Sequence, residues 1–214
     1  MVDADYTEPR ALAPRSPKLK AARRYFEIPI VVLALVAGAA FLTKMCYLSL
    51  AFNTIFVLIF LALFYSYVRI RLGLQIPLTL LALVFLALQV DALGNFFRMY
   101  GRQFGPMQYD EFAHTMVQVL VSPIIVWLTG RVLQQLGYRL PLKLQAFFAA
   151  TIVFSLSAIY EIIELWDEVY FGGHRIWGPY DTATDLQWDL CGIIVGTLFS
   201  CIMLRDTRDQ LVSH

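Results

Sequence analysis

The chain has 214 residues, of which 59% are hydrophobic and only 15% are charged, and its formal net charge is +1. This composition is too apolar for the surface of a soluble domain and indicates an integral membrane protein. The near-neutral balance gives no sign of a nucleic-acid partner, and membrane lipids are the expected surroundings.

Long apolar runs predict the membrane spans, because a helix needs roughly 20 apolar residues to cross about 30 Å of hydrocarbon. Six such runs predict an all-α, polytopic bundle of six transmembrane helices. The first two share residues 29–70, with a break predicted at 44–47, and the others cover 76–97, 110–136, 142–170 and 185–204. The transmembrane domain is therefore predicted at 27–205, between a disordered cytoplasmic tail at 1–26 and a cytoplasmic tail at 206–214.

Lysine and arginine are biased toward the cytoplasmic ends of membrane spans, and this bias predicts the orientation. With both termini in the cytoplasm, most basic residues fall on the inner side: Arg10, Arg15, Lys18, Lys20, Arg23, Arg24, Arg69, Arg71, Arg131, Arg139, Lys143, Arg205 and Arg208. The outer side then holds only Lys44, Arg98, Arg102 and Arg175. This arrangement also fits an even number of spans.

The acidic residues are segregated in the opposite way. Between the first and last helices, every Asp and Glu is predicted to lie toward the outer side: Asp91, Asp110, Glu111, Glu161, Glu164, Asp167, Glu168, Asp181, Asp185 and Asp189. The sequence therefore predicts an acidic end of the bundle.

Two helices carry polar pairs at helical spacing. Asp110 and His114 are four residues apart at the start of the predicted fourth helix, so they lie on one face. Glu161 and Glu164 are three residues apart near the end of the fifth helix, where both carboxylates also share a side. Each pair could bind one ligand.

A similar spacing occurs at the entry to the sixth helix. Asp181, Asp185 and Asp189 recur every four residues, so this segment forms an acidic stripe if it is helical. Asp91 and Asn95 repeat the four-residue spacing at the end of the third helix.

Charged carboxylates are costly in a membrane, at about 2.5–3.5 kcal/mol each near its centre on insertion scales, so they need partners. Converging carboxylates persist by sharing protons, pairing with arginine or holding a cation. An oxygen-rich set with one imidazole suits Mg²⁺, Mn²⁺, Ca²⁺, Zn²⁺ or iron. We therefore predict a divalent metal site, of one or two ions, with the ligands Asp110, His114, Glu161, Glu164, Asp185 and Asp189. Asp91, Asn95 and Asp181 are accessory candidates, and Glu161 or His114 is the candidate for proton transfer.

Each candidate also has an interpretation without a metal. Asp110 and Asp185 stand at predicted helix starts, where N-capping would explain them. His114 and Asp189 could be hydrogen-bonded buried polar residues. Glu161 and Glu164 could form ion pairs with Arg98, Arg102 or Arg175. Three remaining acids could be solvated charges at the membrane boundary: Glu111, Asp167 and Glu168.

Three motifs together resemble a known family. Tyr-Asp-x-x-x-His at 109–114, Tyr-Glu-x-x-Glu-x-Trp at 160–166 and Asp-x-x-x-Asp-x-x-Trp-Asp at 181–189 are similar to the YjdF-like inner-membrane proteins, over residues 85–200. The Asp-x-x-x-His helix start also resembles the VanZ-like membrane proteins. The YjdF-like resemblance implies a multi-pass protein of the cell inner membrane with a polar site, and it implies no reaction.

Three functions follow from these patterns. The first is a metal-dependent enzyme that acts on a lipid or another membrane-adjacent substrate. The second is a cation or proton transporter, against which the position of the acids at one end counts. The third is a non-catalytic subunit or assembly factor that binds a partner in a larger membrane complex.

Overall fold

The computed structural model describes residues 50–173, 176 and 178–212, with side chains up to Leu204. This part of the chain forms five helices: α2 (Leu50–Leu72), α3 (Leu78–Phe96), α4 (Tyr109–Gln135), α5 (Leu142–Phe171) and α6 (Asp181–Val212). All five have an apolar stretch long enough to cross a membrane. The predicted first span, the break at 44–47 and the tail at 1–26 lie outside the described residues.

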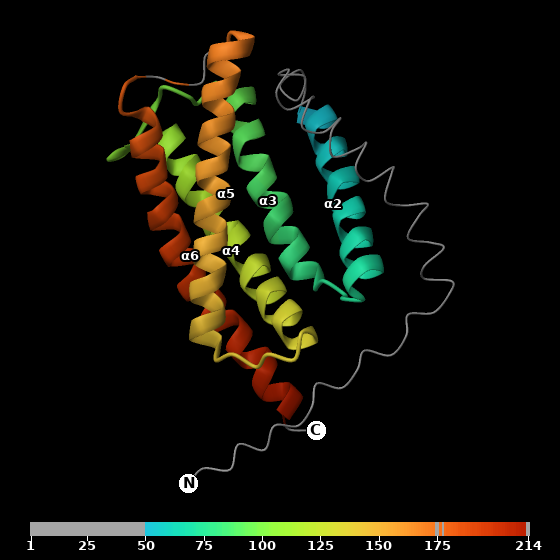
Figure 1. Ribbon diagram of the computed structural model, residues 1–214. Helices are drawn as coiled ribbons and strands as arrows, with labels where there is room; N and C mark the ends of the chain where they lie inside the picture. Colours follow the sequence, from blue (N-terminus) through green and yellow to red (C-terminus); the bar gives the residue numbers. More distant parts are fainter. Residues whose placement is uncertain (1–49, 174–175, 177, 213–214) are drawn as a thin grey trace.

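Helix α4 is the centre of the bundle (Figure 1). Helices α3, α5 and α6 all pack against it, α5 also packs against α6, and α2 packs against α3 at the side. The three helices that carry the predicted ligands are thus mutual neighbours.

Helices α4 and α6 approach each other closely, and two glycines on α6 permit it. A Cβ atom added to Gly192 would overlap the carbonyl oxygen of Thr115, and one added to Gly196 would lie 2.8 Å from the Cα of Val119. Small residues four apart let membrane helices meet backbone to backbone. Ser200, which is fully buried, continues the same row.

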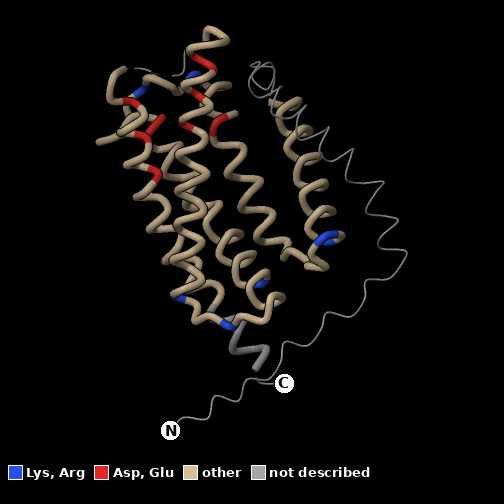
Figure 2. Tube along the Cα trace, in the orientation of Figure 1, with Lys and Arg blue, Asp and Glu red and all other residues tan. Residues whose placement is uncertain are grey.

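Charge divides the bundle into two ends (Figure 2). The acidic end comprises the last turns of α3 and α5 and the first turns of α4 and α6, where the described Asp and Glu residues gather. At the other, basic end lie Arg69, Arg71, Arg131, Arg139 and Lys143. The core of the basic end is apolar, and its buried members are Val68, Ile76, Leu80, Ile124 and Trp127 in one cluster and Val126, Ala146 and Ala149 in another.

The sequence-based helix boundaries agree within two residues for α3, α4 and α5, but not for α6. This helix starts at Asp181, so the predicted start at Asp185 was wrong by one turn. The error arose because Asp181, Thr182 and Thr184 are polar and an apolarity criterion overlooks this turn, although an acidic side chain is favourable in the first turn of a helix. The helix also continues through the predicted tail to Val212.

A short hairpin between α3 and α4 was not predicted. Strand β1 (Gln103–Phe104) pairs antiparallel with β2 (Met107–Gln108), and Gly105, with φ of 62°, allows the tight turn between them. The hairpin leads directly into Tyr109. Tyr109 packs with Tyr100 over Gly94 of α3 and donates a hydrogen bond of 2.6 Å to the Val90 carbonyl. This contact fixes where α4 begins.

Candidate metal centre

The first turn of α4 positions Asp110 and His114. The Glu111 carboxylate accepts a hydrogen bond of 2.8 Å from the Gln108 backbone N–H, which holds the helix start in place. Asp110 is therefore inside the first turn and is not the N-cap residue. Asp185 likewise lies one turn inside α6, so N-capping explains neither aspartate.

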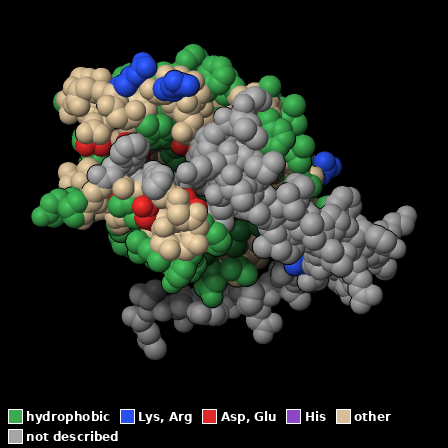
Figure 3. Space-filling view, turned by 90° about the horizontal axis from the view of Figure 1, so that it is seen from above, with side chains coloured by type: hydrophobic (Ala, Val, Ile, Leu, Met, Phe, Trp, Pro, Cys, Tyr) green, Lys and Arg blue, Asp and Glu red, His purple; other side chains and the backbone are tan. Residues whose placement is uncertain are grey.

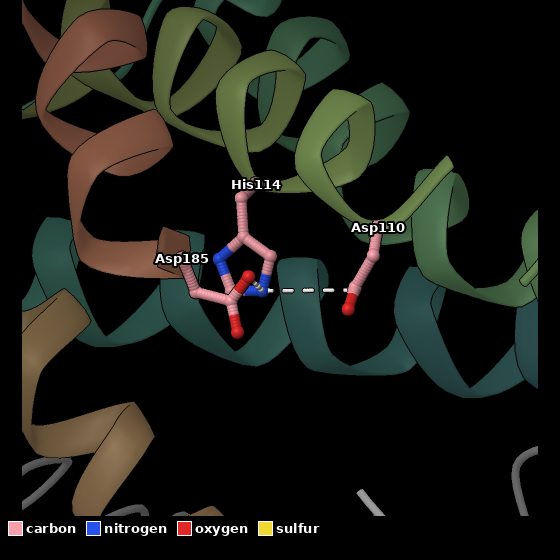
Figure 4. Close-up of side chains that lie close together, drawn as sticks. All are labelled: Asp110, His114 and Asp185. Carbon is pink, nitrogen blue, oxygen red and sulfur yellow. Dashed lines mark ion pairs between the residues drawn. The ribbon is translucent and has the colours of Figure 1, made fainter. Parts of the chain in front are cut away.

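His114 has a carboxyl group on each side of one ring edge (Figure 4). Its Nε2 lies 3.8 Å from Oδ1 of Asp110 and 3.9 Å from Oδ1 of Asp185. Both distances are too long for a hydrogen bond. Atoms that share one ion at about 2.0–2.2 Å stand about 3–3.6 Å from one another, so a small side-chain movement would suffice for these three to bind it.

The other ring nitrogen of His114 faces a different carboxylate. Its Nδ1 lies 3.1 Å from Oδ1 of Asp189, which also accepts a hydrogen bond of 2.9 Å from Nε2 of Gln118. The second oxygen of Asp189 accepts a hydrogen bond from the Ser157 hydroxyl. Asp189 is only 1% exposed, so three helices converge on a single buried carboxylate.

Glu161 is the other buried acid of the cluster. It is 4% exposed, and its Oε1 has no hydrogen-bond partner among the described residues. A carboxylate oxygen of Glu161 lies within 4.8 Å of ligand atoms of His114 and Asp189. An unpaired oxygen at this depth is costly, because burial removes its water without replacing the hydrogen bond.

Two sets of potential ligands therefore share His114. One combines Asp110, His114 and Asp185, and the other combines His114, Glu161 and Asp189, each within 4.8 Å. The structure thus brings together five of the six predicted ligands.

The sixth predicted ligand and one accessory candidate lie at the edge of this cluster. Glu164 is close enough to interact electrostatically with Asp110, Glu161 and Asp185. Asp181 is similarly near Asp110 and Asp185. Neither belongs to the two sets of converging ligand atoms.

The accessory pair Asp91 and Asn95 belongs to a separate contact. The Asp91 carboxylate accepts hydrogen bonds from the Tyr100 hydroxyl and, at 3.1 Å, from the Asn95 amide. Tyr100 lies between α3 and α4, outside the spans. Burial, together with the Asp91 charge, raises the pKa of its hydroxyl well above the usual 10.0.

Side-chain exposure falls steadily from one side of the cluster to the other. It is 23% for Asp110, 13% for His114, 5% for Asp185 and 1% for Asp189. Acidic side chains are also visible at the surface when the molecule is viewed onto this end (Figure 3). Asp110 is therefore the most exposed of these four side chains, and Asp189 is the most deeply buried.

The geometry also bears on two further alternatives. Among the described residues, Glu161 forms no ion pair with Arg98 or Arg102, both of which are exposed. Asp167 was predicted to be a solvated boundary charge, which is wrong, since it is 2% exposed. Six residues place Asp167 about 120° around α5 from Glu161. The segment that follows the helix covers it, since a Cβ atom added to Gly173 would overlap its Oδ2. Arg175 lies outside the described residues.

Gln118 and Ser157, which both contact Asp189, were not among the predicted site residues. A signal for each was present in the sequence. Gln118 follows His114 by four residues, and Ser157 precedes Glu161 by four, so each extends a polar stripe by one turn toward the basic end. The Gly192-x-x-x-Gly196 spacing was also available, and it indicates the contact between α4 and α6.

The comparisons with known proteins bear on this arrangement. A family model described as a predicted membrane protein, DUF2238, matches residues 26–209. The chain belongs to this family. The match confirms the resemblance to the YjdF-like membrane proteins and covers all three motifs from which it was inferred. No curated protein and no solved structure matches the chain.

Proposed function

We propose that this member of the DUF2238 family is a metal-dependent membrane enzyme whose ion is held by Asp110, His114 and Asp185. The observation that carries the proposal is the buried Glu161 oxygen, which has no hydrogen-bond partner among the described residues, in a carboxylate that converges with His114 and Asp189. A cluster of acids alone would be weak support, since exposed acids often bind nothing. A buried carboxylate oxygen with no partner among the described residues would be stabilised by the charge of a cation held beside it, even if Glu161 is not itself a ligand of that ion.

The residues divide into distinct roles. Nε2 of His114 and the carboxylates of Asp110 and Asp185 offer one nitrogen and two oxygens within reach of one ion. Both ring nitrogens of His114 are then engaged, one by the ion and one by Asp189. Glu161 is left for proton transfer, because its oxygen is buried and uncommitted. A bound ion would supply polarisation of a carbonyl or phosphoryl oxygen, or activation of water.

The surroundings favour a lipid or another membrane-adjacent substrate. The cluster lies within about one to three turns of the ends of the helices, near the expected membrane boundary. Exposed aromatic side chains of the kind that anchor proteins at this boundary lie at the same end: Trp166, Tyr170 and Tyr180. By the positive-inside rule, this end lies on the side of the cell inner membrane that faces away from the cytoplasm. Both termini then lie in the cytoplasm.

Transport of a cation or proton is less well supported. Beyond Asp189, the buried hydroxyls of Ser122 and Ser200 donate to carbonyls of their own helices, Gln118 and Gly196, at 2.7 and 2.6 Å. They therefore do not form a chain of groups from one end to the other. The basic end is then closed by the two apolar clusters.

Elemental analysis tests the metal site. Protein purified without chelators and loaded with divalent metals is expected to hold stoichiometric metal. Asp185→Asn and Asp110→Asn should lower the bound fraction strongly. Glu111→Gln is the matched control, because it removes a charge beside Asp110 and keeps an oxygen for the Gln108 N–H. The wild type remaining free of metal under every loading condition would overturn the proposal.

The enzymatic part needs a separate measurement. Wild-type protein in vesicles of bacterial lipids is expected to convert a component of the mixture, followed by mass spectrometry, only when metal is present. Glu161→Gln should abolish conversion while retaining metal. Metal-dependent ion flux without any conversion would favour a transporter, and metal binding with neither would favour a subunit of a larger complex.

A further inference from the structure

The contacts of Asp189 separate it from the other carboxylates of the cluster. Asp110 and Asp185 face Nε2 of His114 at distances beyond hydrogen bonding. Asp189 instead faces Nδ1 at 3.1 Å, and its two oxygens also accept from Gln118 and Ser157. Three donors occupy most of the lone pairs of this carboxylate, which leaves little capacity to bind an ion.

This arrangement determines the protonation pattern of the imidazole. An ionised carboxylate can only accept, so the hydrogen bond to Asp189 keeps a proton on Nδ1. On the neutral ring, the lone pair is then on Nε2, which faces Asp110 and Asp185. Metal-binding histidines are commonly oriented in this way by a carboxylate on the other nitrogen.

We propose that Asp189 fixes His114 so that Nε2 is an obligatory ligand, and that the site consequently takes a transition metal of the zinc and iron class in preference to Mg²⁺ or Ca²⁺. This inference rests on the proposed metal site and goes further, because it names the class of ion. Imidazole suits zinc and iron, whereas Mg²⁺ and Ca²⁺ favour sites made of oxygen alone.

The position of Asp189 makes the constraint rigid. It is held by Gln118 from α4 and Ser157 from α5, and the α6 backbone is held against α4 at Gly192, less than one turn away. The carboxylate can neither rotate away from His114 without losing the other hydrogen bonds nor recruit water, since it is 1% exposed.

Competition titrations of metal-free protein in detergent with Zn²⁺, Mg²⁺ and Ca²⁺ test this. Wild type is expected to prefer Zn²⁺ by at least about 100-fold, in line with the affinity order of nitrogen-containing sites. Asp189→Asn should weaken Zn²⁺ binding about 10–100-fold, because an amide can donate to Nδ1 and move the ring proton to Nε2. Binding of Mg²⁺ and Ca²⁺ should change little, so selectivity should fall.

Two further variants control this result. Ser157→Ala removes one support of Asp189 and should weaken Zn²⁺ binding in the same direction by a smaller factor, which keeps the test valid if Asp189→Asn does not fold. Glu111→Gln should leave all three affinities unchanged. A wild type that prefers Mg²⁺ or Ca²⁺ would contradict the inference, and so would an Asp189→Asn variant whose affinity for all three ions falls equally. Either result would still be consistent with the proposed metal site in the wild type.

Nitrogen NMR of the metal-free protein gives a readout that does not depend on metal binding. The chain has three histidines, so replacing His174 and His214 with Asn leaves His114 as the single signal. As the pH is raised, the neutral ring is expected to keep its proton on Nδ1 in wild type and to shift it toward Nε2 in Asp189→Asn. A proton on Nε2 in wild type would refute the role of Asp189. If the wild type keeps the proton on Nδ1 but binds no metal, the proposed function is refuted and the role of Asp189 in orienting His114 stands.

Discussion

The two ends of the contact between α4 and α6 use different chemistry. At the acidic end, the helices meet through His114, Gln118 and Asp189, which are joined by hydrogen bonds of fixed geometry. At the basic end, Ile124 and Trp127 of α4 are part of an apolar cluster against which Met203 and Leu204 of α6 pack. Hydrogen bonds specify orientation, whereas apolar packing is tolerant of direction and depends on volume. Stability and site geometry should therefore be separable.

The largest effect on stability is expected from the basic end. Leu80, at 2% exposed, is the most deeply buried leucine of its cluster. Leu80→Ala should lower the free energy of unfolding by about 2–5 kcal/mol, because it removes buried methyl groups and leaves a cavity. Denaturation in mixed micelles measures this. Leu78→Ala, on the 80% exposed neighbour, is the control. If metal affinity fell together with stability, the two ends would not be independent.

A smaller effect on stability is expected at the contact between α4 and α6, and here metal affinity should change as well. Gly196→Ala places a Cβ 2.8–2.9 Å from Val119 and Ser122, so the helices must move apart. Overpacking of this kind costs about 1–3 kcal/mol. Because α6 also carries Asp185 and Asp189, metal affinity should fall as well. Val195→Ala, on the 54% exposed neighbour, should change neither quantity. Unchanged metal affinity in Gly196→Ala would show that the site tolerates separation of the helices.

The smallest effect is expected from the contact that sets the start of α4. Tyr109→Phe removes the hydrogen bond to the Val90 carbonyl and should lower the free energy of unfolding by about 0.5–1.5 kcal/mol. The aromatic packing on Gly94 remains, so Asp110 should stay in place and metal affinity should hold. Tyr138→Phe, at a 62% exposed tyrosine, is the control. A marked loss of metal in Tyr109→Phe alone would show that this hydrogen bond also orients the site.

Much of this organisation could be predicted from residue patterns. Apolar run length predicted α3, α4 and α5 closely, and four-residue spacing predicted that Asp110 and His114 share a face. The start of α6 was missed, because three of the four residues from Asp181 to Thr184 are polar and an apolar run begins only after them. Gln118 and Ser157 were missed for a related reason, since neither is charged and neither stands out in a search for ligands.

The sequence by itself determined that the chain is a membrane protein with its acids at one end, because segment length and spacing are properties of each helix alone. Only the tertiary structure decided that Nδ1 of His114 faces Asp189 while Nε2 faces Asp110 and Asp185. That outcome depends on the separation and rotation of α6 against α4. Both are set by close packing at Gly192 and Gly196, together with the contacts of every other helix in the bundle.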